Sequence, residues 1–241
     1  LTINGRLATS GSPITETDHA AYGTDLLLTR NPHDAQRAID LGIAAATVFM
    51  PPYSYNYAPS EGPVKIWVDG DAVAFGSSSE VRFREEGLER YAEMESEEFD
   101  KNLEPGPFTE ILAKMSEVNA RFPRGEQPFE IALVTSRGHT SAARAFNIAQ
   151  NQGIHFNDRM HFLAGADKAQ VISQYRPHIY LDDQMTHLKE TGLHVPAGLV
   201  QHPTGSPMHD YLGQDATDEL QKMRAIEEQN NGRKGPKAEP A

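Results

Sequence analysis

Short apolar runs alternate with segments of helical periodicity along most of the chain, and this alternation constrains the fold more than any other feature. The run at 66–68, Ile-Trp-Val, is apolar throughout, as in a strand covered on both faces of its sheet. Strands are expected at residues 25–29, 43–50, 65–69, 131–135, 162–163, 178–181 and 198–201. Because helices are expected between these runs, the pattern predicts an α/β fold with a mostly parallel sheet flanked by helices.

The predicted elements divide the chain into three parts. Residues 1–60 contain a strand, a helix, a strand and a linker rich in tyrosine and proline, and residues 61–215 contain the remaining alternation and form the predicted core. A highly charged helical excursion at about 76–106 interrupts the core and is expected to form a small cap. Residues 216–241 begin as an amphipathic helix, predicted at 215–229, and end in a polar tail that we expect to be disordered.

Two stretches of the chain echo one another. Residues 22–51 and residues 175–203 both read as a strand, a helix that ends at a glycine, and a second strand. These are either two generic units, or residues 1–60 are the remnant of an N-terminal half-copy of the fold. The first stretch has Thr29-Arg30 where the second has Asp182-Asp183, so it is not expected to hold a metal in the same way.

Charge and composition exclude several classes of partner. The 34 acidic residues outnumber the 22 lysines and arginines, and a formal charge of -12 repels nucleic acid and anionic lipid. The absence of cysteine excludes disulfides and zinc-thiolate sites. No apolar run approaches the ~20 residues of a membrane helix, and the N-terminal residues do not resemble a secretory signal. We therefore expect a cytoplasmic protein without nucleic-acid or membrane partners; a homo-oligomer is compatible with this composition.

Polar residues follow the predicted strands in a fixed order. Asp69-Gly70-Asp71 comes first, followed by Thr135-Ser136, Lys168 and the pair Asp182-Asp183. Because the carboxyl ends of parallel strands converge on one crevice, we expect these residues to meet there. Carboxylates placed so close repel one another unless a cation lies between them. Oxygen ligands alone favour a hard ion, so the sequence predicts a Mg²⁺ site formed by Asp69, Asp71, Asp182 and Asp183.

Each of these residue types suits one task in phosphoryl transfer. Ionised Asp69 can attack phosphorus in line and form an aspartyl-phosphate. Asp71 can protonate the leaving oxygen and then deprotonate the water that hydrolyses the intermediate. Gly70 lets the backbone approach a phosphate closely. Thr135-Ser136 offers hydrogen-bond donors to the phosphoryl oxygens, and Lys168 supplies positive charge.

Each residue also has a structural interpretation. An Asp-x-Asp sequence or an Asp-Asp pair commonly caps a helix, as does a threonine after a strand, and a single lysine is commonly solvated. Arg137 is expected either to contact a phosphate or to cap the helix that follows it. The conjunction of these residues at successive strand ends favours the catalytic interpretation.

The same segments resemble the four motifs of the haloacid dehalogenase superfamily. The resemblance lies in Val68-Asp-Gly-Asp-Ala-Val73, Leu133-Val-Thr-Ser-Arg137, Lys168 and Leu181-Asp-Asp183. Their order differs from that of response-regulator receivers, in which the acidic pair comes first. The resemblance implies a Rossmann-like, haloacid dehalogenase-like fold with a cap insertion.

Longer strings are similar to the cytosolic 5'-nucleotidase I family. They span residues 42–49, 69–73, 162–166 and 176–187. The similarity implies Mg²⁺-dependent hydrolysis of nucleoside 5'-monophosphates, AMP-like in several members, and family members carry a further N-terminal segment of which only the tail is expected here. Two alternatives are a phosphatase of another small phosphomonoester, such as a sugar phosphate, and a catalytically silent nucleotide-binding module.

Overall fold

The computed structural model describes residues 12–52, 55, 62–97, 101, 103–138, 141–157, 159–211 and 218–224, without the side chains of 88–97. The elements, in chain order, are α1 (Glu16–Tyr22), β1 (Leu26–Thr29), α2 (Pro32–Asp40), β2 (Ala44–Val48), β3 (Val64–Val68), η1 (Gly70–Ala74), α3 (Ser78–Glu97), α4 (Thr109–Asn119), β4 (Phe129–Thr135), α5 (Ala142–Asn151), β5 (Met160–Phe162), α6 (Lys168–Tyr175), β6 (Ile179–Asp182), α7 (Met185–Thr191) and β7 (Ala197–Leu199). Of the helix predicted at 215–229, residues 218–224 are helical, and the rest lies outside the described residues, as does the predicted tail.

The strands form one seven-stranded sheet in the order β1-β2-β7-β6-β3-β4-β5. All neighbouring strands are parallel except β2 and β7, which are antiparallel and pair Thr47 with Leu199 and Val48 with Gly198. The predicted α/β fold with a mostly parallel sheet is therefore confirmed. Strands β1 and β2 of the unit β1–α2–β2 are antiparallel to the other five strands, and the unit joins them where β2 pairs with β7. Its origin as a half-copy stays a prediction.

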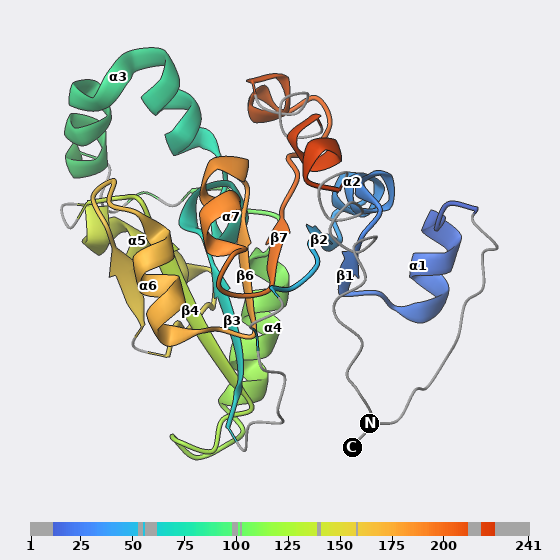
Figure 1. The fold of residues 1–241 in the computed structure, drawn as a ribbon. Coiled ribbons are helices and arrows are strands. Elements are labelled where there is room, and N and C mark those ends of the chain that lie inside the picture. The colour runs from blue at the N-terminus through green and yellow to red at the C-terminus, as the bar shows by residue number, and fades with distance from the viewer. Residues whose placement is uncertain are drawn as a thin grey trace, which may run out of the picture.

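Alternate residues of the central strands point to two different cores. Ile66 and Val68 of β3 belong to the apolar cluster that contains residues of α4 and α5. Trp67 belongs to the cluster on the other face, with residues of α6 and α7. Figure 1 shows α4 behind the sheet and α6 and α7 in front of it. Because β3 is buried on both faces, its apolar run shows no alternation in sequence.

The excursion between β3 and α4 leaves the core and returns to it at one place. Phe75 forms an isolated antiparallel bridge with Pro105, and the Gly76 N–H donates to the Glu104 carbonyl at 2.7 Å. The Glu104 carboxylate accepts hydrogen bonds from the backbone and the hydroxyl of Ser78, each at 2.8 Å. These contacts form a neck beneath α3, which stands beyond the carboxyl ends of the strands (Figure 1).

Local hydrogen bonds explain where several helices begin. Asn31 caps α2 through its side chain, which accepts from the His33 N–H, and Pro32 occupies the first turn. Helix α1, which was not predicted from the sequence, starts with a capping box between Thr15 and Asp18.

In the part of the chain that the structure describes, no helix has the length and apolarity needed to cross a membrane.

Gly198 allows β7 to pack closely against the side chains of both neighbouring strands, β6 and β2. A Cβ built on this residue would lie 3.0 Å from Leu181 Cδ2 and 3.3 Å from Ala46 Cβ. We predict that Gly198→Val lowers the free energy of unfolding by about 1–3 kcal/mol, because a branched side chain overfills this junction. Gly62→Val is the control, since a Cβ there meets nothing within 4 Å. Urea denaturation measures both, and equal stabilities would contradict the close packing.

Candidate active site

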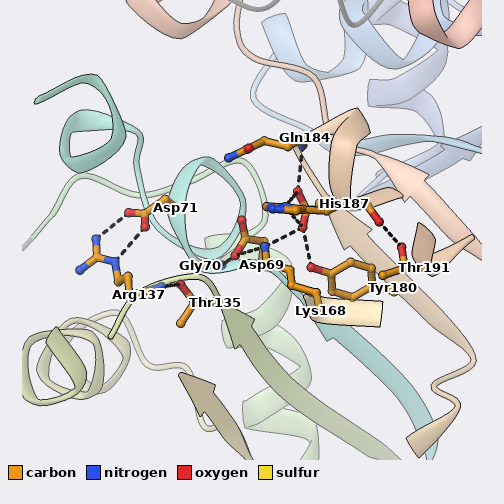
Figure 2. A network of polar contacts seen from close by, with 11 residues as sticks. Asp69, Gly70, Asp71, Thr135, Arg137, Lys168, Tyr180, Gln184, His187 and Thr191 are labelled. Atoms are coloured by element: carbon orange, nitrogen blue, oxygen red, sulfur yellow. Dashed lines mark hydrogen bonds and ion pairs between the residues drawn. The ribbon is translucent and has the colours of Figure 1, made fainter. Parts of the chain in front are cut away.

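The sheet order brings the predicted site residues to one edge. Strand β3 lies between β6 and β4, so Asp69 after β3 lies between Asp182 at the end of β6 and Thr135 at the end of β4. Lys168 is the first residue of α6, which Asp167 caps by accepting from the Ala169 N–H. Figure 2 shows Asp69, Thr135 and Lys168 lying close together. The predicted convergence of strand ends is thus observed for Asp69, Thr135, Lys168 and Asp182.

Lys168 links two of the carboxylates. Its ammonium lies 2.9 Å from Asp69 Oδ1 and 2.8 Å from Asp182 Oδ2, and its side chain is 1% exposed. Burial by itself lowers the pKa of Lys168, but the Asp182 and Asp69 carboxylates outweigh burial and raise the pKa above its ordinary value. Lys168 is therefore a permanent cation in this site.

Asp69 is buried and held on one oxygen. Its Oδ1 accepts from the Gly70 N–H at 2.7 Å and pairs with Lys168. Burial raises the pKa of Asp69 to about 8, with Lys168 opposing this shift and the Asp182 and Asp183 carboxylates adding to it. One lysine is thus not enough to keep the whole cluster ionised near neutral pH, and an additional cation would favour the ionised form of Asp69.

Asp182 has a full set of hydrogen-bond donors. Besides Lys168, its oxygens accept from the Tyr180 hydroxyl and from the Gln184 N–H at 2.8 Å, and His187 Nδ1 lies 3.2 Å from Oδ2. Burial alone raises the pKa of Asp182, but Lys168 and His187 outweigh it and hold the pKa below its ordinary value. Asp182 is therefore an ionised anchor for the lysine.

Asp183 is in the opposite situation. It is 2% exposed, and neither of its carboxylate oxygens has a hydrogen-bond partner among the described residues. His202 Nε2 lies 3.4 Å from Asp183 Oδ2, and burial lowers the pKa of His202 to about 4, so this imidazole is neutral at pH 7. Burial raises the pKa of Asp183 well above its ordinary value. An orphaned, buried carboxylate is a position that a metal ion would complete.

The loops that follow β3 and β4 approach one another closely. A Cβ built on Gly70 would lie 3.2 Å from Thr135 Oγ1, so only glycine leaves this gap open. Thr135 is buried, whereas Ser136 is exposed. The residues after β4 are also tied to the β5 loop, where Leu163, Ala164 and Gly165 donate backbone hydrogen bonds to the carbonyls of residues 135, 137 and 136.

Asp71 lies away from the Lys168 cluster. Its side chain points toward the β4 loop, where Arg137 Nε donates to Oδ2 at 2.8 Å and Arg137 Nη2 contacts Oδ1 (Figure 2). Neither role expected for Arg137, a phosphate contact or a helix cap, describes this arrangement. The structure therefore brings Asp71 to Arg137 and not to Asp69.

Two comparisons place the chain among known proteins. The family model described as 5'-nucleotidase matches residues 1–206. The chain belongs to the 5'-nucleotidase family. It is 32% identical over 174 residues to human cytosolic 5'-nucleotidase 1B, in a match that covers 70% of this chain and 28% of that protein. The predicted similarity to the cytosolic 5'-nucleotidase I family is thus confirmed, while the chain spans well under two thirds of this relative's length. No solved structure matches the chain.

Among the described residues of this 5'-nucleotidase family member, Asp69, Asp182 and His187 are the group of three whose ligand atoms all lie within 4.8 Å of one another. Asp182 and His187 already contact each other, and Asp182 already receives Lys168, Tyr180 and Gln184. We therefore consider Asp69 and the unpartnered Asp183 the better pair for a metal. The acidic residues present fit such an ion.

The sequence reading missed several residues that shape this site. Tyr180, Gln184, His187 and His202 are not among the site residues predicted from the sequence. Tyr180 lies two residues before Asp182, so the alternation of a strand signals that the two side chains share a face. For His202, a signal was its place directly after the strand predicted at residues 198–201.

Tyr180 supports Asp182 from inside the core. Its ring is fully buried, and its hydroxyl donates to Asp182 Oδ2. We predict that Tyr180→Phe lowers the free energy of unfolding by about 1.5–3 kcal/mol, the range for a hydrogen bond to a charged group. Tyr211→Phe is the matched control, because the Tyr211 hydroxyl donates to Glu85 from a side chain that is largely exposed. Its effect is expected within about 0.5 kcal/mol; equal losses would contradict the role of Tyr180.

Proposed function

We propose that this chain hydrolyses nucleoside 5'-monophosphates, AMP-like ones among them, to nucleoside and phosphate, with Asp69 as the nucleophile. The observation that carries the proposal is the Asp69 carboxylate, buried at a strand end and held by Lys168 and the Gly70 N–H. Membership of the 5'-nucleotidase family supports the substrate class. The name of the human relative supports a cytoplasmic location.

The contacts of Asp69 leave one oxygen for chemistry. Both contacts described for its carboxylate use Oδ1, so Oδ2 is the atom that we assign to attack. In the first step Oδ2 bonds to phosphorus, the bond from phosphorus to the ribose oxygen breaks, and the nucleoside leaves with a proton from Asp71. In the second step Asp71 takes a proton from water, which attacks phosphorus and returns Asp69 as a carboxylate.

The phosphate would lie between two loops and the lysine. Thr135 ends β4 and Ser136 follows it, a Cβ built on Gly70 would lie 3.2 Å from Thr135 Oγ1, and Lys168 begins α6. Donors fixed before the substrate arrives stabilise the charge that develops on the phosphoryl oxygens without reorganising. The same donors would serve a sugar phosphate, so the profile of substrates decides between the two.

Asp69 and Asp183 are the residues that we assign to hold Mg²⁺, with Asp71 and Asp182 as their neighbours in the predicted acidic set. Bound there, the ion would neutralise carboxylate charge and polarise the phosphoryl group. The support is the chemistry of the donors: oxygen ligands, no cysteine in the chain, and a buried Asp183 without a hydrogen-bond partner among the described residues.

Replacing the nucleophile tests the proposal directly. We expect Asp69→Asn to lower the rate of phosphate release from AMP by at least about 10³-fold, because an amide does not form the acyl-phosphate. Asp25→Asn is the control, since Asp25 pairs with Lys114 through side chains that are about half exposed. Unchanged turnover in Asp69→Asn would refute the nucleophile. Equal turnover of AMP and sugar phosphates by the unaltered protein would refute the nucleotide preference, and no turnover of either would favour the silent binding module.

The two adjacent aspartates should respond in opposite ways. In EDTA at pH 7, Asp183→Asn is expected to raise the free energy of unfolding by at least about 1 kcal/mol, because it removes a carboxyl group whose pKa is raised by burial and which therefore destabilises the fold above its unfolded pKa. Asp182→Asn is expected to lower it by about 3–5 kcal/mol, because Lys168 loses a partner. Calorimetric titration should show at least about 10-fold weaker Mg²⁺ binding for Asp183→Asn. Unchanged Mg²⁺ binding in that variant would show that the ion binds on the Asp182 side and not at Asp183.

A further inference from the structure

The pair of Arg137 and Asp71 is the strongest charged contact in the site that the proposed mechanism does not explain. Two guanidinium nitrogens, Nε and Nη2, contact the two oxygens of the same carboxylate. The Arg137 side chain is 2% exposed and that of Asp71 is 15% exposed. A paired fork of this kind fixes the direction of a carboxylate as well as its distance.

The backbone of Arg137 is fixed on both sides. Its N–H donates to Thr135 Oγ1 at 3.2 Å, and its carbonyl accepts from the Ala164 N–H at 3.1 Å. The guanidinium therefore extends from a loop that hydrogen bonds hold in place. It crosses to the loop after β3, which carries both Asp69 and Asp71 (Figure 2). Arg137 thus connects two loops that are expected to surround the phosphate.

The contacts also distinguish this role from the two expected earlier. Helix α5 begins at Ala142 with Ser141 at its cap position, so Arg137 lies outside the first turn of the helix. The Asp71 carboxylate occupies the Nε–Nη2 edge of the guanidinium, which is the edge suited to a paired contact with a phosphate. The observed contact is with the residue to which the proposed mechanism assigns proton transfer.

We propose that Arg137 is a positioning residue that sets where the Asp71 carboxyl group lies during proton transfer. The inference rests on the proposed function, since Asp71 exchanges a proton with the leaving oxygen and then with water. A carboxyl group that rotates freely reaches these oxygens only part of the time, and a misplacement of about 1 Å can cost 10²-fold in rate. Arg137 acts through Asp71 and needs no contact with the nucleotide.

The test compares single and double variants of Arg137 and Asp71 by their rates of nucleoside release in single-turnover experiments with AMP. Arg137→Met is expected to lower the rate of nucleoside release by about 10–100-fold, while the inhibition constant of inorganic phosphate changes by less than about 3-fold. Arg137→Lys keeps the charge but loses the fork, so it should also be slow. In an Asp71→Asn background, adding Arg137→Met should change the rate by less than about 2-fold, because nothing is left to position.

Arg159→Met is the matched control. Arg159 lies 3.5 Å from Glu130, in an ion pair that precedes β5 and is therefore at the opposite end of the sheet. The Arg159→Met variant should release nucleoside at the same rate as the unaltered protein. Circular dichroism of each variant checks folding, and Arg137→Lys supplies the result if Arg137→Met does not fold.

Three outcomes would overturn the inference. If the inhibition constant of inorganic phosphate for Arg137→Met rises by the same factor as the rate falls, Arg137 is a phosphate ligand. Rate losses that multiply in the double variant would mean that Arg137 acts independently of Asp71, and an unchanged rate in Arg137→Met and Arg137→Lys would leave it only a structural role. Failure of the proposed function is a separate result, because it is seen as undiminished activity in Asp69→Asn, whatever Arg137 does.

Discussion

The contact of one buried ammonium group with two buried carboxylates holds this site together. Lys168 reaches Asp69 and Asp182 from a helix on one face of the sheet, at distances below 3 Å. Taking three charges out of water is unfavourable unless each finds partners. The donors around Asp182 and the backbone N–H on Asp69 supply them. The strand ends can therefore stay close despite their like charges.

The charges of the site are balanced in pairs, with one exception. Asp182 has Lys168 and His187, and Asp71 has Arg137, whereas Asp183 faces only a neutral imidazole among the described residues. Burial raises the pKa values of both Asp69 and Asp183, and the neighbouring carboxylates add to the rise. The proposed metal ion would add positive charge on the Asp183 side of Asp69.

The sequence predicted what depends on local pattern and missed what depends on direction in space. Buried parallel strands show as apolar runs, so the strands that carry Asp69, Thr135 and Asp182 were expected within a few residues of their observed bounds. The antiparallel pairing of β2 with β7 was not expected, because periodicity carries no information about strand direction. The pair of Asp71 and Arg137 spans 66 positions in the sequence, and only the folded chain shows where the two side chains point.

The neck at Phe75 and Pro105 has a consequence for how such a protein can diverge. Because the chain leaves and rejoins the core through one bridge, the core responds to the closure of the excursion and hardly to its length. Lengthening a closed loop costs little, about 0.6 kcal/mol for each doubling. The segment over the site can therefore be exchanged or extended while the strand ends below keep their geometry. In evolutionary terms, insertions and deletions in the excursion and substitutions at the strand ends are under separate structural constraints.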